Sequence, residues 1–136
     1  MQDIGHWING KLVAGTSGRY AQVFNPATGE QQARVALATQ AELNHAIEEA
    51  AKAQVGWAAT NPQRRARVMM AFGALINRDM DKLAEMVARE HGKTIPDAKG
   101  DVQRGLEVIE FACGIPHLMK GEFTDGAGPG IDLYSM

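Results

Sequence analysis

Residues 94–116 read TIPDAKGDVQRGLEVIEFACGIP and place apolar residues on two sides of one predicted helix. The first side is formed by Ala98, Val102, Gly105, Leu106, Ile109, Ala112 and Cys113. The second side is formed by Gly100, Arg104, Val108, Phe111 and Ile115. A helix at a protein surface needs one apolar face, so a helix with two is expected to be covered by two layers. We therefore expect this chain to be the front part of a larger protein, in which its own lobe covers one side and another region covers the other.

Helical patterns also fill the region before this segment. Thr39-Gln40-Ala41-Glu42 has the form of a capping box, which begins a helix. Asn61-Pro62 begins a second helix, because the missing N–H of a proline costs nothing in the first turn. A third helix begins at Asn77 or Asp79 and ends at Gly92, in the position where glycine commonly ends helices. The sequence thus predicts helices over about 40–115.

The two ends of the chain are predicted to form strands and loops, in contrast to the helices between them. Asn9-Gly10 suits the two-residue turn of a hairpin, and we expect further short antiparallel strands at Tyr20–Phe24 and Ala33–Ala38. Glycines and one proline in 121–130 predict a loop, and 131–136 could begin a strand with no partner after it.

Composition limits the possible functions. The 136 residues suit one domain, and a net charge of −2 excludes a strongly basic nucleic-acid-binding surface. The longest apolar run has nine residues, which is far short of the ~20 that a membrane-spanning helix needs. The N-terminus resembles no secretory signal, and a single cysteine agrees with a reducing compartment. We therefore expect a cytoplasmic location, with no nucleic-acid or membrane partner.

Most candidate reactive groups have a structural interpretation. Cys113 lies among apolar residues without a histidine nearby in sequence, which favours a buried structural thiol over a nucleophile. The four histidines form no metal-ligand pattern. Gly126–Gly130 neither follows a strand nor opens a helix, as a dinucleotide loop must. The basic cluster in 64–67 is favoured as a solvated helix start over a pyrophosphate or CoA contact.

Arg104 has two interpretations. Its guanidinium presents a rigid fork of donors that matches a carboxylate. On spacing alone, an ion pair with Asp101 or Glu107 is favoured over an anion supplied from elsewhere.

Four features, in this order and spacing, resemble the N-terminal region of aldehyde dehydrogenases. They are Ile8-Asn9-Gly10-Lys11, Asn25-Pro26-Ala27-Thr28-Gly29-Glu30, the alanine-rich helix ending in Trp57, and Glu90-His91-Gly92-Lys93-Thr94. Residues 100–122 resemble, more narrowly, the CoA-acylating methylmalonate-semialdehyde dehydrogenases. The resemblance implies the α/β aldehyde dehydrogenase fold, of which this chain alone would be a mostly α part with short antiparallel β-strands near its N-terminus.

The resemblance also implies a chemistry. Such enzymes oxidise malonate or methylmalonate semialdehyde with NAD and transfer the acyl group to coenzyme A. The carboxylate carbon is lost as carbon dioxide, so the products are acetyl-CoA or propionyl-CoA, in valine, pyrimidine or inositol catabolism. A thiolate attacks the aldehyde, hydride leaves to the nicotinamide, and coenzyme A attacks the thioester. An arginine on the helix that matches residues 94–116 helps to hold the substrate carboxylate, and the matching residue is Arg104. The resemblance reverses the preference from spacing and makes Arg104 the one substrate-binding candidate.

The same resemblance predicts what this chain lacks. The nucleophilic cysteine and the main NAD-binding strands of the family lie further along the sequence, so we expect no catalytic, cofactor-binding or metal-binding residue here and no cofactor bound to this part alone. Residues 1–125 would be the N-terminal lobe of the NAD-binding domain, with a β segment at 1–38. Residues 126–136 would be a linker and the start of an oligomerisation strand, in a homodimer or homotetramer. Two alternatives remain, namely an aldehyde dehydrogenase with water as acyl acceptor and a stand-alone helical interaction module without catalysis.

Overall fold

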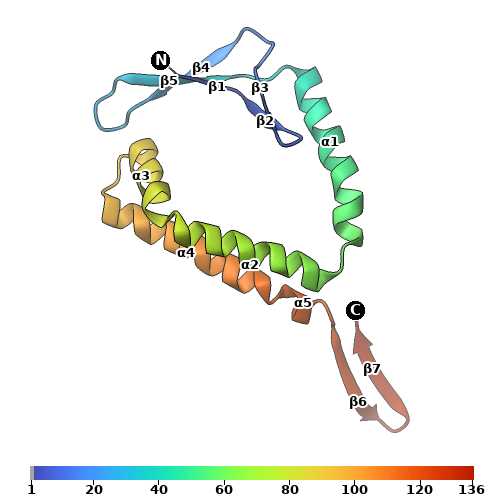
Figure 1. Ribbon diagram of the computed structural model, residues 1–136. Helices are drawn as coiled ribbons and strands as arrows, with labels where there is room; N and C mark the ends of the chain where they lie inside the picture. The colour runs from blue at the N-terminus through green and yellow to red at the C-terminus, as the bar shows by residue number, and fades with distance from the viewer. Residues whose placement is uncertain (1) are drawn as a thin grey trace. The chain divides into compact units, whose positions relative to one another are not determined.

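The computed structural model describes residues 2–136 and is mostly helical, with short strands at both ends (Figure 1). The strands are β1 Gln2–Ile4, β2 His6–Ile8, β3 Lys11–Val13, β4 Tyr20–Phe24, β5 Gln31–Ala36, β6 Glu122–Gly128 and β7 Ile131–Ser135. The helices are α1 Gln40–Ala59, α2 Pro62–Arg78, α3 Met80–His91, α4 Ile95–Cys113 and α5 Ile115–Leu118. The predicted secondary-structure class is therefore confirmed.

The chain forms two compact units. One holds the residues up to Thr60 together with Ala84–Ala98, and the other holds Asn61–Leu83 and Lys99–Met136. The boundary predicted between residues 125 and 126 stays a prediction.

The first unit contains a three-stranded sheet of order β1-β5-β4 and a separate hairpin of β2 and β3. The hairpin turns at Asn9 and Gly10, whose φ angles of 50° and 71° are those of the predicted turn. Strands β4 and β5 pair antiparallel, whereas β1 pairs parallel with β5. The parallel strand was not predicted, because nothing in a three-residue segment specifies a partner about thirty positions away.

Helix α1 begins at the predicted capping box. The Thr39 hydroxyl accepts a hydrogen bond from the Glu42 backbone N–H at 3.1 Å, and the Glu42 carboxylate accepts one from the Thr39 backbone N–H at 2.7 Å. These bonds satisfy backbone donors that the first turn leaves without partners. Helix α2 begins at Asn61 with Pro62 in its first turn, and Gly92 follows α3 with a φ of 78°. All three predicted signals are confirmed.

In the second unit, α2 and α4 lie side by side (Figure 1). A Cβ at Gly73 of α2 would lie 3.5 Å from the side chains of both Leu106 and Ile109 of α4. These are ordinary van der Waals distances, so α2 and α4 are in contact at Gly73, and Leu106 and Ile109 are only 4% and 8% exposed. This contact fixes which side of α4 is buried.

The predicted loop at 121–130 is wrong over most of its length. Strand β6 covers Glu122–Gly128 and pairs antiparallel with β7, so 131–135 does have a strand partner, which precedes it. The glycines were interpreted as loop signals, but Gly130, with a φ of 73°, serves the turn. A register shift between Thr124 and Gly128 accommodates Gly126 inside the strand.

Candidate functional site

Helix α4 has one buried side and one exposed side. Thr94 caps its start, where its hydroxyl donates to the Asp97 carboxylate at 2.8 Å and accepts the Asp97 backbone N–H at 3.4 Å. The first predicted apolar side includes Ala98, Leu106 and Ile109, which are all buried. This side therefore packs within the chain, as the helical spacing predicted, except at Gly105, which is exposed.

The second predicted side is exposed. Val108 and Phe111 are 68% and 67% exposed, and Ile115 just beyond the helix is also exposed. A Cβ at Gly100, one turn before Arg104, would meet no atom within 4 Å. Large apolar side chains on one exposed face are typical of a surface that another element or a ligand covers.

Arg104 lies on this exposed side between Gly100 and Val108. Its side chain is 82% exposed, and its Nη1 atom lies 4.0 Å from Oδ1 of Asp101, one turn earlier on the helix. That distance exceeds a hydrogen bond, so the contact is a loose ion pair. Spacing favoured an ion pair with either Asp101 or Glu107, and the pair forms with Asp101, but it leaves the guanidinium largely exposed to solvent. The two interpretations of Arg104 are therefore compatible.

The other sequence candidates lie apart from any assembled site. Cys113 is a free thiol, half-buried at the end of α4. Within residues 2–136, no three His, Cys, Asp or Glu side chains are grouped in a way that could hold a metal ion. Gly126–Gly130 lies in β6 and its turn into β7, which is not the strand-to-helix setting of a dinucleotide loop. The basic residues of 64–67 lie in the first turns of α2, where the Nε atom of Arg65 is buried without a hydrogen-bond partner.

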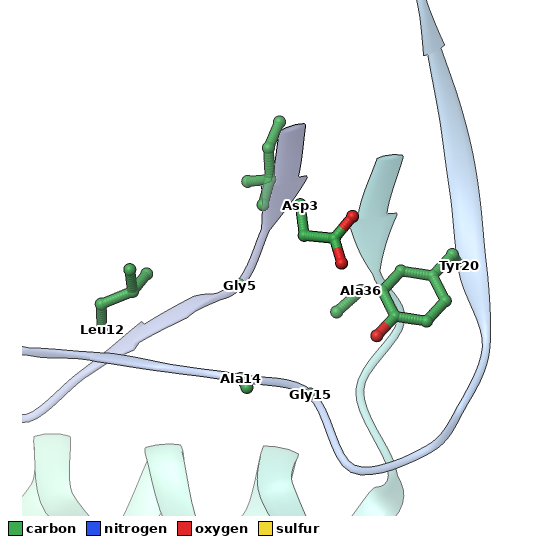
Figure 2. A pocket seen from close by; sticks show the side chains of 8 residues that line it. Asp3, Gly5, Leu12, Ala14, Gly15, Tyr20 and Ala36 are labelled. Atoms are coloured by element: carbon green, nitrogen blue, oxygen red, sulfur yellow. The ribbon is translucent and has the colours of Figure 1, made fainter. Parts of the chain in front are cut away.

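The sequence did not predict a cavity of about 300 Å³ in the first unit. Figure 2 shows the Asp3 carboxylate and the Tyr20 ring close together at one side of it, with Leu12 at the other. Arg34 donates two hydrogen bonds to Asp3, at 2.7 and 2.9 Å, and its guanidinium lies 4.2 Å from the centre of the Tyr20 ring. The hydrogen bonds from Arg34 lower the pKa of the Asp3 carboxyl. This polar edge of the cavity is therefore already paired, and the cavity lacks an open charged group like that of Arg104.

No helix in the described part of the chain has the length and apolar character needed to cross a membrane.

Comparison with known proteins gives consistent matches. The model of the aldehyde dehydrogenase family matches residues 12–135. Malonate-semialdehyde dehydrogenase of Pseudomonas aeruginosa is 42% identical over 135 residues, which are 99% of this chain and 27% of that protein. A crystal structure of methylmalonate-semialdehyde dehydrogenase from Oceanimonas doudoroffii matches with a TM-score of 0.86 and 45% identity, over 97% of this chain and 27% of that one.

A second crystal structure, from Sinorhizobium meliloti, was solved with NAD and is provisionally named a methylmalonate-semialdehyde dehydrogenase. It matches with a TM-score of 0.88 and 66% identity, over 98% of this chain and 27% of that one. The chain thus spans about a quarter of the length of these relatives. The family match over nearly the whole chain and the agreement of the folds lead to one conclusion: the chain belongs to the aldehyde dehydrogenase family.

Proposed function

We propose that this chain is the N-terminal part of an NAD-dependent, CoA-acylating malonate- or methylmalonate-semialdehyde dehydrogenase, in which Arg104 binds the substrate carboxylate. The observation that carries the proposal is the position of Arg104. It is an open cation on the exposed face of α4, beside uncovered apolar side chains. The relatives named for semialdehyde substrates support the choice of substrate class.

The physical role of Arg104 follows from its chemistry. A semialdehyde of this class carries an aldehyde at one end and a carboxylate at the other. A guanidinium can donate two parallel hydrogen bonds to a carboxylate, which fixes the orientation of the substrate as well as its affinity. Exposed Val108 and Phe111 would give that charge pair an apolar surrounding once the face is covered, and exclusion of water strengthens such a pair.

The residues described here do not fit NAD or coenzyme A. A dinucleotide pyrophosphate is usually held at a glycine-rich turn that opens a helix, whereas the glycine-rich segment of this chain lies in a β-hairpin. NAD would accept hydride and coenzyme A the acyl group in the full-length enzyme, and no step that involves them is assigned to residues of this chain. Assembly as a homodimer or homotetramer and a cytoplasmic location belong to the same proposal, because the family resemblance and the single cysteine favour them.

The test of the proposal uses a full-length enzyme that carries this segment. Arg104→Ala is expected to raise KM for malonate semialdehyde about ten- to a hundredfold, the size of a lost hydrogen bond to a charged group. Propanal, which lacks the carboxylate, is the control substrate and should show little change. An equal rise in KM for both aldehydes would contradict the role of Arg104 in carboxylate binding. Turnover of the unmodified enzyme without coenzyme A would identify water as the acyl acceptor, which is the alternative function.

The 136-residue chain should show no turnover with malonate semialdehyde, NAD and coenzyme A. It lacks the downstream thiol that the resemblance assigns to the reaction. Sustained turnover by this chain alone would contradict that assignment.

A further inference from the structure

We infer that Asp101 is a positioning residue for the substrate carboxylate, because it restricts the Arg104 guanidinium before substrate binds. This inference rests on the proposed function of Arg104. The evidence is the geometry of the two side chains on α4, where they lie three residues apart and so on neighbouring positions of one helix face.

The two side chains differ in how firmly they are held. Asp101 is 34% exposed, whereas Arg104 is 82% exposed. A short, partly covered side chain has fewer accessible rotamers than a long exposed arginine, which loses more of that freedom when it binds. Asp101 is therefore the fixed member of the pair, and Arg104 is the mobile one.

The separation of the pair leaves Arg104 able to bind. At 4.0 Å, Asp101 attracts one end of the guanidinium without occupying its donors through a hydrogen bond. A shorter, bidentate pair would compete directly with a substrate carboxylate. The loose pair instead favours side-chain positions near Asp101 and leaves the fork free for the second anion.

The negative charge of Asp101 has an opposite effect, because it repels an incoming carboxylate. A substrate carboxylate bound by the guanidinium would lie further from Asp101 than the guanidinium does, so its repulsion by Asp101 is weaker than the attraction within the pair. We expect the restriction of Arg104 to outweigh the repulsion. The direction of the change in KM therefore distinguishes the two effects.

The test compares Asp101→Asn and Asp101→Glu in the full-length enzyme. Asp101→Asn should raise KM for malonate semialdehyde about threefold, as expected for an exposed pair of this kind, and leave kcat and the KM for propanal unchanged. Asp101→Glu keeps the negative charge, so its KM for malonate semialdehyde should stay close to that of the unmodified enzyme. The rise should shrink at 1 M salt, where the pair is screened.

Glu107→Gln is the matched control. Glu107 lies three residues after Arg104 on the same helix, and the described residues show no ion pair for it. Its replacement removes the same charge and should not raise KM.

A lower KM for Asp101→Asn, or equal rises for malonate semialdehyde and propanal, would overturn the positioning role. If Arg104→Ala is selective for the carboxylated aldehyde while Asp101→Asn has no effect, this inference fails and the proposed function stands. If neither variant is selective, the proposed function itself fails.

Discussion

Glu42 of helix α1 accepts two hydrogen bonds from Thr16, which lies 26 positions earlier in the chain. The backbone N–H and the hydroxyl of Thr16 lie 2.8 and 2.9 Å from the same carboxylate oxygen. The other oxygen of Glu42 accepts from the backbone and the hydroxyl of Thr39. One side chain therefore caps α1 and also holds the loop before β4 against the start of the helix.

Acid should loosen this junction. The backbone N–H groups of Thr39 and Thr16 lower the pKa of Glu42 to about 2 from an ordinary 4.5. A carboxyl whose pKa is lower in the folded state stabilises the fold above its unfolded pKa, and that contribution is lost as the pH falls through the folded pKa. The contribution of Glu42 should thus be complete above about pH 5 and should disappear between pH 4.5 and 2. An NMR titration of the Glu42 side chain should give a midpoint near 2, and a midpoint near 4.5 would contradict these contacts.

Glu42→Gln tests the same junction at neutral pH. The amide keeps the shape but supplies one acceptor oxygen where the carboxylate has two, so Tm should fall by roughly 3–6 °C at pH 7. Glu48→Gln, on an exposed position of the same helix, is the matched control and should leave Tm unchanged.

The two sides of α4 should respond differently to truncation in the 136-residue chain. Ile109→Ala removes a buried side chain beside Gly73 and should cost about 2–4 kcal/mol. Phe111→Ala removes an exposed one and should change the free energy of unfolding by no more than about 0.5 kcal/mol. Denaturant unfolding of both variants measures the difference. A large loss for Phe111→Ala would show that this side is packed within the chain after all.

Local signals in the sequence predicted the helices and the first hairpin well. The capping box at Thr39, the proline at position 62 and Asn9-Gly10 each act through backbone groups within a few residues, so neighbouring residues are sufficient to specify them. The buried side of α4 was also predictable, because helical spacing alone puts Leu106 and Ile109 together.

Long-range pairing was not predictable in the same way. The parallel partner of β1 lies about thirty positions away, and the glycines of 126–130 carried a loop signal that the partner strand β7 overrides. For Arg104, spacing identified Asp101 or Glu107 as a partner but could not choose between them or give the 4.0 Å separation from Asp101 that leaves the guanidinium open. That separation depends on side-chain rotamers, which the residue pattern does not encode.

The pair of Asp3 and Arg34 should hold β1 to β5. The two residues are direct partners in the strand register. Nε of Arg34 donates to Oδ1 of Asp3, and Nη2 of Arg34 donates to Oδ2. Arg34→Lys keeps the charge but cannot make two parallel bonds. Amide hydrogen exchange in β1 should become roughly two- to fivefold faster, while exchange in the β2–β3 hairpin, which lies outside this sheet, should be unchanged. Equal acceleration in both would indicate general destabilisation instead.

Gly100 of α4 provides a test of what covers the exposed side of that helix, and Gly105 on the other side provides a comparison. A Cβ at Gly100 or at Gly105 would meet no atom within 4 Å, and neither residue has a positive φ. Glycine inside a helix costs about 0.5–1 kcal/mol relative to alanine, so Gly100→Ala and Gly105→Ala should each stabilise the 136-residue chain by about that amount. In a full-length enzyme whose remaining part packs closely beside Arg104, the added methyl at position 100 should instead reduce kcat/KM for malonate semialdehyde, since it lies one turn from the guanidinium. If Gly100→Ala stabilises the 136-residue chain but lowers the activity of the full-length enzyme, another part of that enzyme packs closely against Gly100. If the activity of the full-length enzyme is unchanged, the surface around Gly100 is open there too.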